Sequence, residues 1–286
     1  MTDIALDWAR FAAPATPPCV MGVLNVTPDS FSDGGRFEHI EAALHHARQM
    51  VEEGARIVDI GGESSRPGSL AVPSDVQCAR VLPVIRALRA ELPASVVLSV
   101  DTRSPEVAAA ALAAGVGLVN DISGGTAPGM LETVAAHGAA LVLMHMQGTP
   151  ETMQVSPAYD DVVGEVLAYL LARAKAAEAA GIARGKLLLD PGIGFGKTRA
   201  HNLALLAALP RFVATGYPVL LGTSRKRFMG AICRETEFTA LLGATCATTA
   251  LGVAAGVKVF RVHDVRANRQ AMEVAWAIRE AGAAQA

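Results

Sequence analysis

The sequence lacks the marks of a nucleic-acid-binding, secreted or disulfide-stabilised protein. Its formal net charge is −2, so no overall basic field attracts nucleic acid or an anionic membrane. The first ten residues contain two aspartates and no apolar run, which is not the pattern of a secretory signal. The four cysteines are widely spaced and form no CxxC or Cys/His cluster. We therefore expect idle thiols in a reducing cytoplasm, and no nucleic acid or membrane as partner.

Long apolar runs are also scarce. Residues 239–257 lack charged side chains over the length of a membrane span. This stretch holds four threonines, one cysteine and three glycines, so it is weakly apolar compared with the roughly 20 strongly apolar residues of a transmembrane helix. We expect a helix that is buried against the rest of the domain and runs into the last strand.

What the chain does contain is one pattern repeated eight times: a short apolar run, a polar and often glycine-containing cluster, and then a stretch typical of a helix. The runs read VMGVLN, RIVDI, VVLSV, VGLVN, ALVLMHM, KLLLD, PVLLG and VKVF. This alternation predicts an α/β fold, the (β/α)8 TIM barrel of roughly 250 residues. The chain has 286 residues and no linker. We therefore predict a single domain over residues 1–286, with its core at about 19–282.

The expected elements follow from the apolar runs and the helix start and stop signals. Strands should end near residues 24, 60, 100, 120, 144, 190, 222 and 261. Helices should cover about residues 38–53, 74–92, 159–180 and a final stretch to 280. Ser74 has the position of a helix N-cap, and Ser104-Pro105 that of a helix start.

Four strand ends carry a carboxylate or an amide, at Asn25, Asp101, Asn120 and Asp190. Any one of them could be a simple turn former. Because strand ends of a barrel converge at one mouth, however, four equivalent groups predict one pocket. Carboxylates accept paired N–H bonds, and amides both donate and accept. Such a set suits a flat heterocycle such as a purine, pterin or flavin, with Met144 as a possible apolar wall.

The first two loops are longer than ordinary connections of roughly two to six residues. They read VTPDSFSDGG and GGESSRPG, and the second carries Arg66. Their glycines and hydroxyls predict mobile lids over the barrel mouth.

Basic residues gather after the last two strands. TSRKR should begin the helix after the seventh strand, where backbone N–H groups and side-chain charge favour an anion. RVHD follows the eighth strand and adds Arg261 and His263. Facing Asn25 and Arg66, these two side chains predict a pocket for phosphates.

The glycine-rich segment DPGIGFGKT only superficially resembles a phosphate-binding loop. Its glycines do not match G-x-x-x-x-G-K-[ST]. We therefore expect a tight turn in which Asp190 is the functional group and Lys197 is solvated. His145 should point away from Met144 by strand alternation and is not predicted to be a ligand. No His and carboxylate spacing suits zinc, whereas magnesium held by phosphate oxygens would fit.

These motifs, in this order, closely resemble the dihydropteroate synthase family, the folate-pathway enzymes that sulfonamides inhibit. The similarity rests on MGVLNVTPDSFSDGG, DIGGESSRPG, LMHMQGTP and SRK followed by RVHDV, and it covers nearly the whole chain. It implies condensation of 6-hydroxymethyl-7,8-dihydropterin diphosphate with 4-aminobenzoate to give 7,8-dihydropteroate and diphosphate. It also implies Mg²⁺ as cofactor, a cytoplasmic homodimer, and sulfonamides as competitive inhibitors.

The resemblance further implies site residues. The pterin would be bound by Asp101, Asn120, Asp190 and Lys226, in a slot lined by Ile122, Met144, Phe195 and Gly222. Its diphosphate would be held by Asn25, Arg66, Arg261 and His263, with magnesium touching Asn25. The 4-aminobenzoate would contact Phe31, Ser65, Arg66, Pro67, Lys226 and the backbone of Arg227. Asp101, Lys226 and Arg261 are the expected catalytic groups, with diphosphate leaving first in an SN1-like path.

Two positions depart from the family pattern. Ser65 stands where threonine is common, which keeps the hydroxyl. Arg227 stands where a small residue is common, which is harmless if only its N–H is used.

Two other functions remain open. A pterin-binding methyltransferase domain of the folate–corrinoid type shares the barrel and the Asp/Asn set, but it would not need Arg66, Pro67 or the first loop. A barrel that binds pterin only as a scaffold should have lost parts of the lids or Lys226. Their presence favours the synthase.

Overall fold

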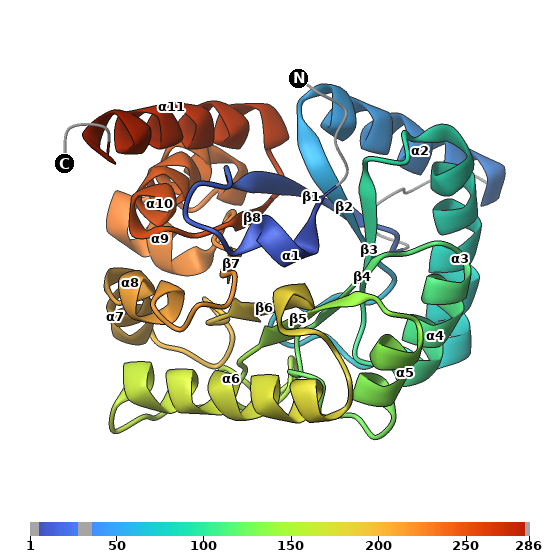
Figure 1. The fold of residues 1–286 in the computed structure, drawn as a ribbon, viewed down its shortest axis with the longest axis horizontal. Helices are drawn as coiled ribbons and strands as arrows, with labels where there is room; N and C mark the ends of the chain where they lie inside the picture. The colour runs from blue at the N-terminus through green and yellow to red at the C-terminus, as the bar shows by residue number, and fades with distance from the viewer. Residues whose placement is uncertain (1–5, 28–35, 284–286) are drawn as a thin grey trace.

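Eight parallel strands form the centre of the molecule, and helices surround them (Figure 1). The structure, a computed structural model, describes residues 6–27 and 36–283. The strands are β1 Cys19–Asn25, β2 Ala55–Gly61, β3 Val97–Asp101, β4 Leu118–Asp121, β5 Ala140–Met144, β6 Leu187–Asp190, β7 Leu220–Leu221 and β8 Val259–Val262. Their order in the sheet is β6-β5-β4-β3-β2-β1-β8-β7.

The sheet is closed between its two edge strands. Leu189 of β6 forms a parallel bridge with Val219, next to β7, and the Leu189 N–H donates to the Pro218 carbonyl at 2.9 Å. β7 has only two residues, so this bridge carries the closure. The predicted (β/α)8 barrel is confirmed, and the expected element ends agree with the structure within a few residues.

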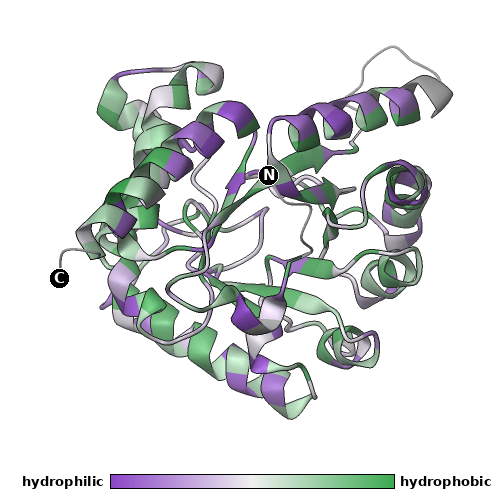
Figure 2. Ribbon diagram, turned by 45° about the horizontal axis from the view of Figure 1, so that its top comes forward, coloured by the Kyte–Doolittle hydropathy of each residue, from purple (hydrophilic) through white to green (hydrophobic). Residues whose placement is uncertain are grey.

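The helices cover the outer face of the barrel (Figure 1). The α-helices are α1 Trp8–Phe11, α2 Arg36–Glu52, α3 Ser74–Glu91, α4 Pro105–Ala113, α5 Met130–Ala136, α6 Val162–Ala179, α7 Arg199–Ala207, α8 Leu209–Val213, α9 Arg227–Cys233, α10 Leu242–Ala255 and α11 Val265–Ala283. Two 3-10 helices are η2 Arg184–Lys186 and η3 Phe238–Leu241. Purple residues on the outer helices mark their hydrophilic positions (Figure 2).

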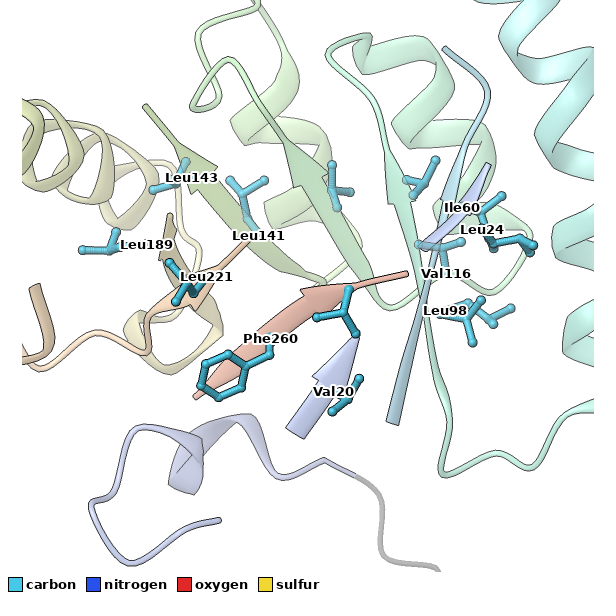
Figure 3. Packing of buried hydrophobic residues seen from close by; sticks show 14 of the residues in the cluster. Val20, Leu24, Ile60, Leu98, Val116, Leu141, Leu143, Leu189, Leu221 and Phe260 are labelled. Atoms are coloured by element: carbon cyan, nitrogen blue, oxygen red, sulfur yellow. The ribbon is translucent and has the colours of Figure 1, made fainter. Parts of the chain in front are cut away.

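Strand alternation divides the core into two parts. Outward-facing residues such as Leu98, Leu141 and Phe260 pack under the helices (Figure 3). Inward-facing residues fill the barrel, and Phe11 of α1 joins them. Lys258 secures this N-terminal segment, because its Nζ donates to the Ala13 carbonyl at 2.8 Å. The barrel interior is therefore packed and not a pore.

One of the two predicted helix starts needs correction. Ser74 is the first residue of α3 and not its cap, and its Oγ instead bonds Ser104 Oγ at 2.9 Å. Ser104 does cap α4, accepting from the Val107 N–H at 3.2 Å.

The charge-free stretch is only partly buried. Residues 238–255 are helical over a length and composition that could cross a membrane. One side of α10 packs inward through Thr245, Thr249, Gly252 and Val253. Its Leu251 is 69% exposed, so the predicted burial against the domain holds for one face of the helix only.

Candidate active site

Two layers of inward-facing side chains explain where the site lies. The lower layer is apolar and consists of Met21, Ile57, Leu118, Val142, Leu188, Leu220 and Val259. Two residues further along each strand, alternation places a second layer towards the C-terminal mouth. Its members are Val23, Asp59, Asn120, Met144, Asp190, Gly222 and Arg261. The C-terminal end of the barrel therefore carries polar side chains above an apolar layer. The name polar floor is used here for Asp59, Asn120, Asp190 and Arg261 of the second layer together with Asp101 at the end of β3.

Asp59 is the centre of this floor, and the sequence analysis missed it. The side chain is fully buried. It accepts from Ser99 Oγ at 2.6 Å, from Asn120 Nδ2 at 3.0 Å and from Arg261 Nε at 2.6 Å. The sequence did indicate its position. Asp59 lies two residues after Ile57 within the apolar run RIVDI, so both side chains face the same side of the strand, which is the barrel interior. It was missed because Asp59 lies before the strand end.

Arg261 joins two carboxylates. Besides Asp59, it reaches Asp101, whose Oδ2 accepts from Arg261 Nη2 at 2.8 Å. Burial raises the pKa of Asp101 to about 7, while Arg261 opposes the rise and Asp59 adds to it. Asp101 is therefore a carboxylate whose charge depends on neighbouring cations.

The opposite wall is formed by the end of β6 and the loop after it. Asp190 Oδ1 accepts from the Gly192 N–H at 2.7 Å. Burial raises the pKa of Asp190 to about 6, although the Gly192 bond and the nearby Lys226 oppose the shift. Lys226 Nζ lies 4.1 Å from the centre of the Phe195 ring. Burial, reinforced by Arg261, lowers the pKa of Lys226 to about 8.

Three residues that were predicted to line the pterin site adjoin these walls. Met144 and Ile122 are buried on the β5 and β4 side. A Cβ on Gly222 would lie 3.9 Å from Asp190 Oδ2 and 4.0 Å from Arg261 Cβ. A glycine at this position leaves the surface between the Asp190 carboxylate and the base of the Arg261 side chain free of a side chain, which suits a flat ligand.

Asn25 lies beside Asp101 at the ends of β1 and β3. Both residues pair in register with Gly61 of the intervening strand. A Cβ on Gly61 would lie 3.6 Å from Asn25 Oδ1 and 3.7 Å from Asp101 Cβ. The structure therefore brings Asn25, Asp101, Asn120, Asp190 and Arg261 together at the barrel mouth.

His263 follows β8 and is held by Ser224 from the loop after β7. Its Nδ1 lies 2.9 Å from Ser224 Oγ, and its backbone N–H donates to the same oxygen at 3.2 Å. Burial lowers the pKa of His263 to about 3, and Arg261 and Arg225 lower it further. The ring is consequently neutral over the physiological range in the free protein.

The outer loops are far less bonded than the floor. Arg66 and Pro67 are exposed, and within the described residues the Arg66 side chain has no hydrogen bond or ion pair to the other predicted diphosphate ligands. Gly68 N–H donates to the Pro150 carbonyl at 2.9 Å, which joins the loops after β2 and β5. Ser65 is half-buried, and Arg227 is exposed with its Cζ 5.7 Å from the Phe238 ring centre. Phe31 lies outside the described residues.

The prediction of a solvated Lys197 was wrong. Only 3% of Lys197 is exposed. Its Nζ donates to the Phe195 carbonyl at 2.9 Å and lies 3.0 Å from His145 Nδ1. Burial lowers the pKa of Lys197 to about 7, and burial together with Lys197 lowers the pKa of His145 to about 3. The pair fastens the loop after β6 to the end of β5.

Within residues 6–27 and 36–283, no group of three His, Cys, Asp or Glu side chains is placed to hold a metal ion. Any metal in this site would need most of its ligands from a substrate or from water.

Comparison with known proteins assigns the chain to a family. The family profile described as pterin binding enzyme matches residues 21–263. A dihydropteroate synthase of Synechocystis is 45% identical over 260 residues, which cover 91% of this chain and 89% of that protein. The chain belongs to the dihydropteroate synthase family of pterin-binding enzymes.

Solved structures of dihydropteroate synthases have the same fold. The enzyme of Yersinia pestis, solved with a sulfonamide drug, superposes with a TM-score of 0.87 at 42% identity and covers 96% of both chains. The enzyme of Xanthomonas albilineans, solved with 4-aminobenzoic acid, has a TM-score of 0.86 at 47% identity and covers 92% of this chain and 93% of its own. The dihydropteroate synthase fold therefore extends over the whole barrel described above.

Proposed function

We infer that the protein condenses 6-hydroxymethyl-7,8-dihydropterin diphosphate with 4-aminobenzoate, forming 7,8-dihydropteroate and diphosphate. The observation that carries this function is the polar floor of buried Asp101, Asn120 and Asp190 at the strand ends, in a chain of the dihydropteroate synthase family. The relatives solved with 4-aminobenzoic acid and with a sulfonamide support an arylamine as second substrate and sulfonamides as its competitors.

The floor is built to recognise a pterin edge. Asp190 and Asp101 can accept the ring N–H and amino protons, and Asn120 can both donate and accept. Asp59 accepts one of the two Asn120 amide N–H donors at 3.0 Å, which leaves the second N–H and the Asn120 oxygen for a ligand. Met144 and Ile122 provide apolar faces for the ring, and Arg261 can stack on it.

Cationic and neutral donors would bind the diphosphate. Arg261 and Arg66 supply guanidinium groups, and His263 supplies a neutral N–H donor. Their bonds stabilise the negative charge that grows on the leaving group. Since Arg66 lies on an exposed loop, its contribution requires that loop to settle on bound substrate.

Magnesium is the cofactor that we propose. Asn25 offers one amide oxygen at the end of β1, and the described residues hold no acidic cage. A single protein oxygen suits a hard cation that takes its other ligands from phosphate and water. When bound, the ion would help to neutralise the diphosphate.

Departure of diphosphate leaves positive charge on the pterin methylene, and the Asp101 carboxylate would stabilise it. The amine of 4-aminobenzoate then attacks the methylene carbon and loses a proton. For this second substrate we propose contacts with Lys226, Ser65, Pro67, Phe31 and the Arg227 N–H. Closure of the first two loops would exclude water, which competes with the amine for the cation.

Turnover by the purified protein tests the reaction. Dihydropterin diphosphate, magnesium and labelled 4-aminobenzoate are mixed with the protein, and labelled dihydropteroate is sought, with Lys226→Ala in parallel. Product from the wild type and much less from the variant would support both the reaction and the site. Bound pterin without product would favour the methyltransferase or scaffold alternatives.

We also propose a homodimer formed through α10 and α11. These helices border a groove of about 640 Å³ with an almost wholly apolar lining. Val274 and Ile278 are 62% and 69% exposed, an arrangement that favours burial against a second copy. Sedimentation at micromolar concentration should give the mass of a dimer, and a monomer would count against the proposal.

A cytoplasmic location is proposed on chemical grounds. All four cysteines are free thiols, and Cys233 is exposed, which suits a reducing compartment.

A further inference from the structure

Ser224 holds His263 in a way that decides which ring nitrogen carries the proton. Ser224 is 6% exposed and lies in the turn after β7. Its Oγ lies 3.2 Å from the His263 backbone nitrogen and 2.9 Å from His263 Nδ1. One hydroxyl group therefore contacts both the backbone and the ring of the same histidine.

The donor and the acceptor in these two contacts follow from the hydrogen-bonding capacity of each group. A backbone N–H can only donate, so Ser224 Oγ accepts from it. The hydroxyl proton then needs an acceptor of its own, and among the described residues His263 Nδ1 is the recorded partner. When Nδ1 accepts this proton it is itself unprotonated, and a neutral ring then carries its single proton on Nε2.

The turn that carries Ser224 is fixed by two further elements. Arg225 adopts a left-handed backbone with φ of 58°. Its side chain makes a bidentate ion pair with Asp264, the residue after His263, at 2.7 Å and 3.1 Å. Its backbone N–H donates to Thr245 Oγ1 of α10 at 3.3 Å. A strained conformation persists where surrounding contacts over-determine it.

α10 holds the same turn at a second point. Thr223 Oγ1 lies 2.7 Å from Thr248 Oγ1. The threonines that made residues 239–257 too polar for a membrane span thus support the loop after β7.

We propose that Ser224 is a positioning residue that keeps His263 in the Nε2–H tautomer, and that the Arg225–Asp264 pair keeps Ser224 in place to do so. The proposal rests on the assignment of His263 to the diphosphate subsite. Because Nδ1 is turned to Ser224, the Nε2–H lies on the other edge of the ring and serves as a donor to a phosphate oxygen. Without Ser224, a neutral histidine could place its proton on Nδ1 and present a lone pair to the anion.

Nuclear magnetic resonance of protein labelled with ¹⁵N-histidine tests the tautomer without any turnover. The chain has seven histidines, and the His263→Gln variant identifies the relevant signals. Long-range ¹H–¹⁵N spectra of the wild type should show Nε2 protonated and Nδ1 bare. In Ser224→Ala the His263 signals should move towards the opposite tautomer. A protonated Nδ1 in the wild type, or unchanged signals in Ser224→Ala, would overturn the proposal.

Binding of inorganic diphosphate with magnesium gives the second readout. Ser224→Ala should weaken it by about tenfold, as expected for one hydrogen bond to a charged ligand, while the KM for 4-aminobenzoate stays unchanged. Ser224→Thr keeps the hydroxyl and should restore both the affinity and the tautomer. An equal loss for both ligands together with a lower Tm would assign Ser224 a merely structural role. If the protein bound no diphosphate, the proposed function would fail while the tautomer result still stood.

Discussion

The polar floor of the barrel and the loops above it are built differently. The floor, defined as Asp59, Asp101, Asn120, Asp190 and Arg261, lies on or just before strand ends, and short bonds link four of these residues, all but Asp190. The loop side, defined as Ser65, Arg66, Pro67 and Arg227, is largely exposed and sparsely bonded. One half of the site is therefore organised before substrate arrives, and the other half must be ordered by it.

This difference matches the two substrates that we propose. A rigid heterocycle with a fixed edge gains most from acceptors that are already in place, since no ordering cost is paid on binding. The diphosphate and the second substrate enter and leave from the solvent side, so the groups that meet them must be able to move. Substitutions in the floor should thus affect folding and function together, and those in the loops function alone.

The largest effect is expected for Asp59→Ala. This change leaves Arg261 with one carboxylate and removes the acceptor of Ser99 and Asn120. Breaking a buried ion pair costs about 3–5 kcal/mol, so the free energy of unfolding measured in urea should fall by roughly that amount, and turnover should be lost. Met144→Leu, at a nearby apolar position, is the control for stability and should lower the free energy of unfolding by less than about 1.5 kcal/mol. Unchanged stability would mean that the floor is not cross-linked through Asp59.

The next effect is expected for Asp101→Asn, which removes charge but preserves shape. If the carboxylate stabilises the pterin cation, kcat should fall by about 10²–10³, and the free energy of unfolding should also fall, but by less than for Asp59→Ala, because the Asp59–Arg261 ion pair is kept. The pKa of Asp101 is raised to about 7, so the charge is present above that pH and lost below it. Because kcat/KM reports the ionisation of the free enzyme, the wild-type kcat/KM should decline as the pH falls through about 7, and the variant should lack this decline. A near-normal kcat in Asp101→Asn would show that the Asp101 carboxylate does not stabilise the pterin cation.

Arg66→Ala should lower catalytic efficiency but leave stability almost unchanged. Because the side chain is exposed, the free energy of unfolding should change by no more than about 0.5 kcal/mol. The loss of a charge-assisted contact to diphosphate should lower kcat/KM by roughly tenfold to a hundredfold. Urea unfolding and steady-state kinetics on the same preparation measure both quantities. A drop in stability equal to the drop in transition-state binding would contradict the division between floor and loops.

The same division explains what the sequence could predict. Buried parallel strands appear in the sequence as short continuous apolar runs, and Asp101, Asn120 and Asp190 follow such runs directly, so the barrel and the position of these three residues could be predicted locally. That Asp59 accepts three hydrogen bonds could not be predicted, because its partners lie 40, 61 and 202 residues away along the chain.

Lys197 was misplaced for a related reason. A lysine in a glycine-rich loop is ordinarily solvated, and only the fold shows that this loop lies against the end of β5. A Cβ on Gly192 would clash with the His145 carbonyl oxygen, so only a glycine permits the close approach of the two loops that buries the lysine. Local sequence carries no sign of such long-range packing.

The smallest effect is expected for Arg227→Ala, and it measures how much of the loop side is used. Arg227 is the first residue of α9, and its guanidinium lies near Phe238 and not in the slot. If 4-aminobenzoate uses only the backbone N–H, the variant keeps this donor, and the KM for 4-aminobenzoate should change by less than about twofold. A glutamate at the same position separates the two cases, since a carboxylate near the substrate would repel it even when the N–H is intact. A tenfold rise in KM with alanine would show that the guanidinium binds the substrate carboxylate, and the exposed loops would then contribute affinity as well as closure.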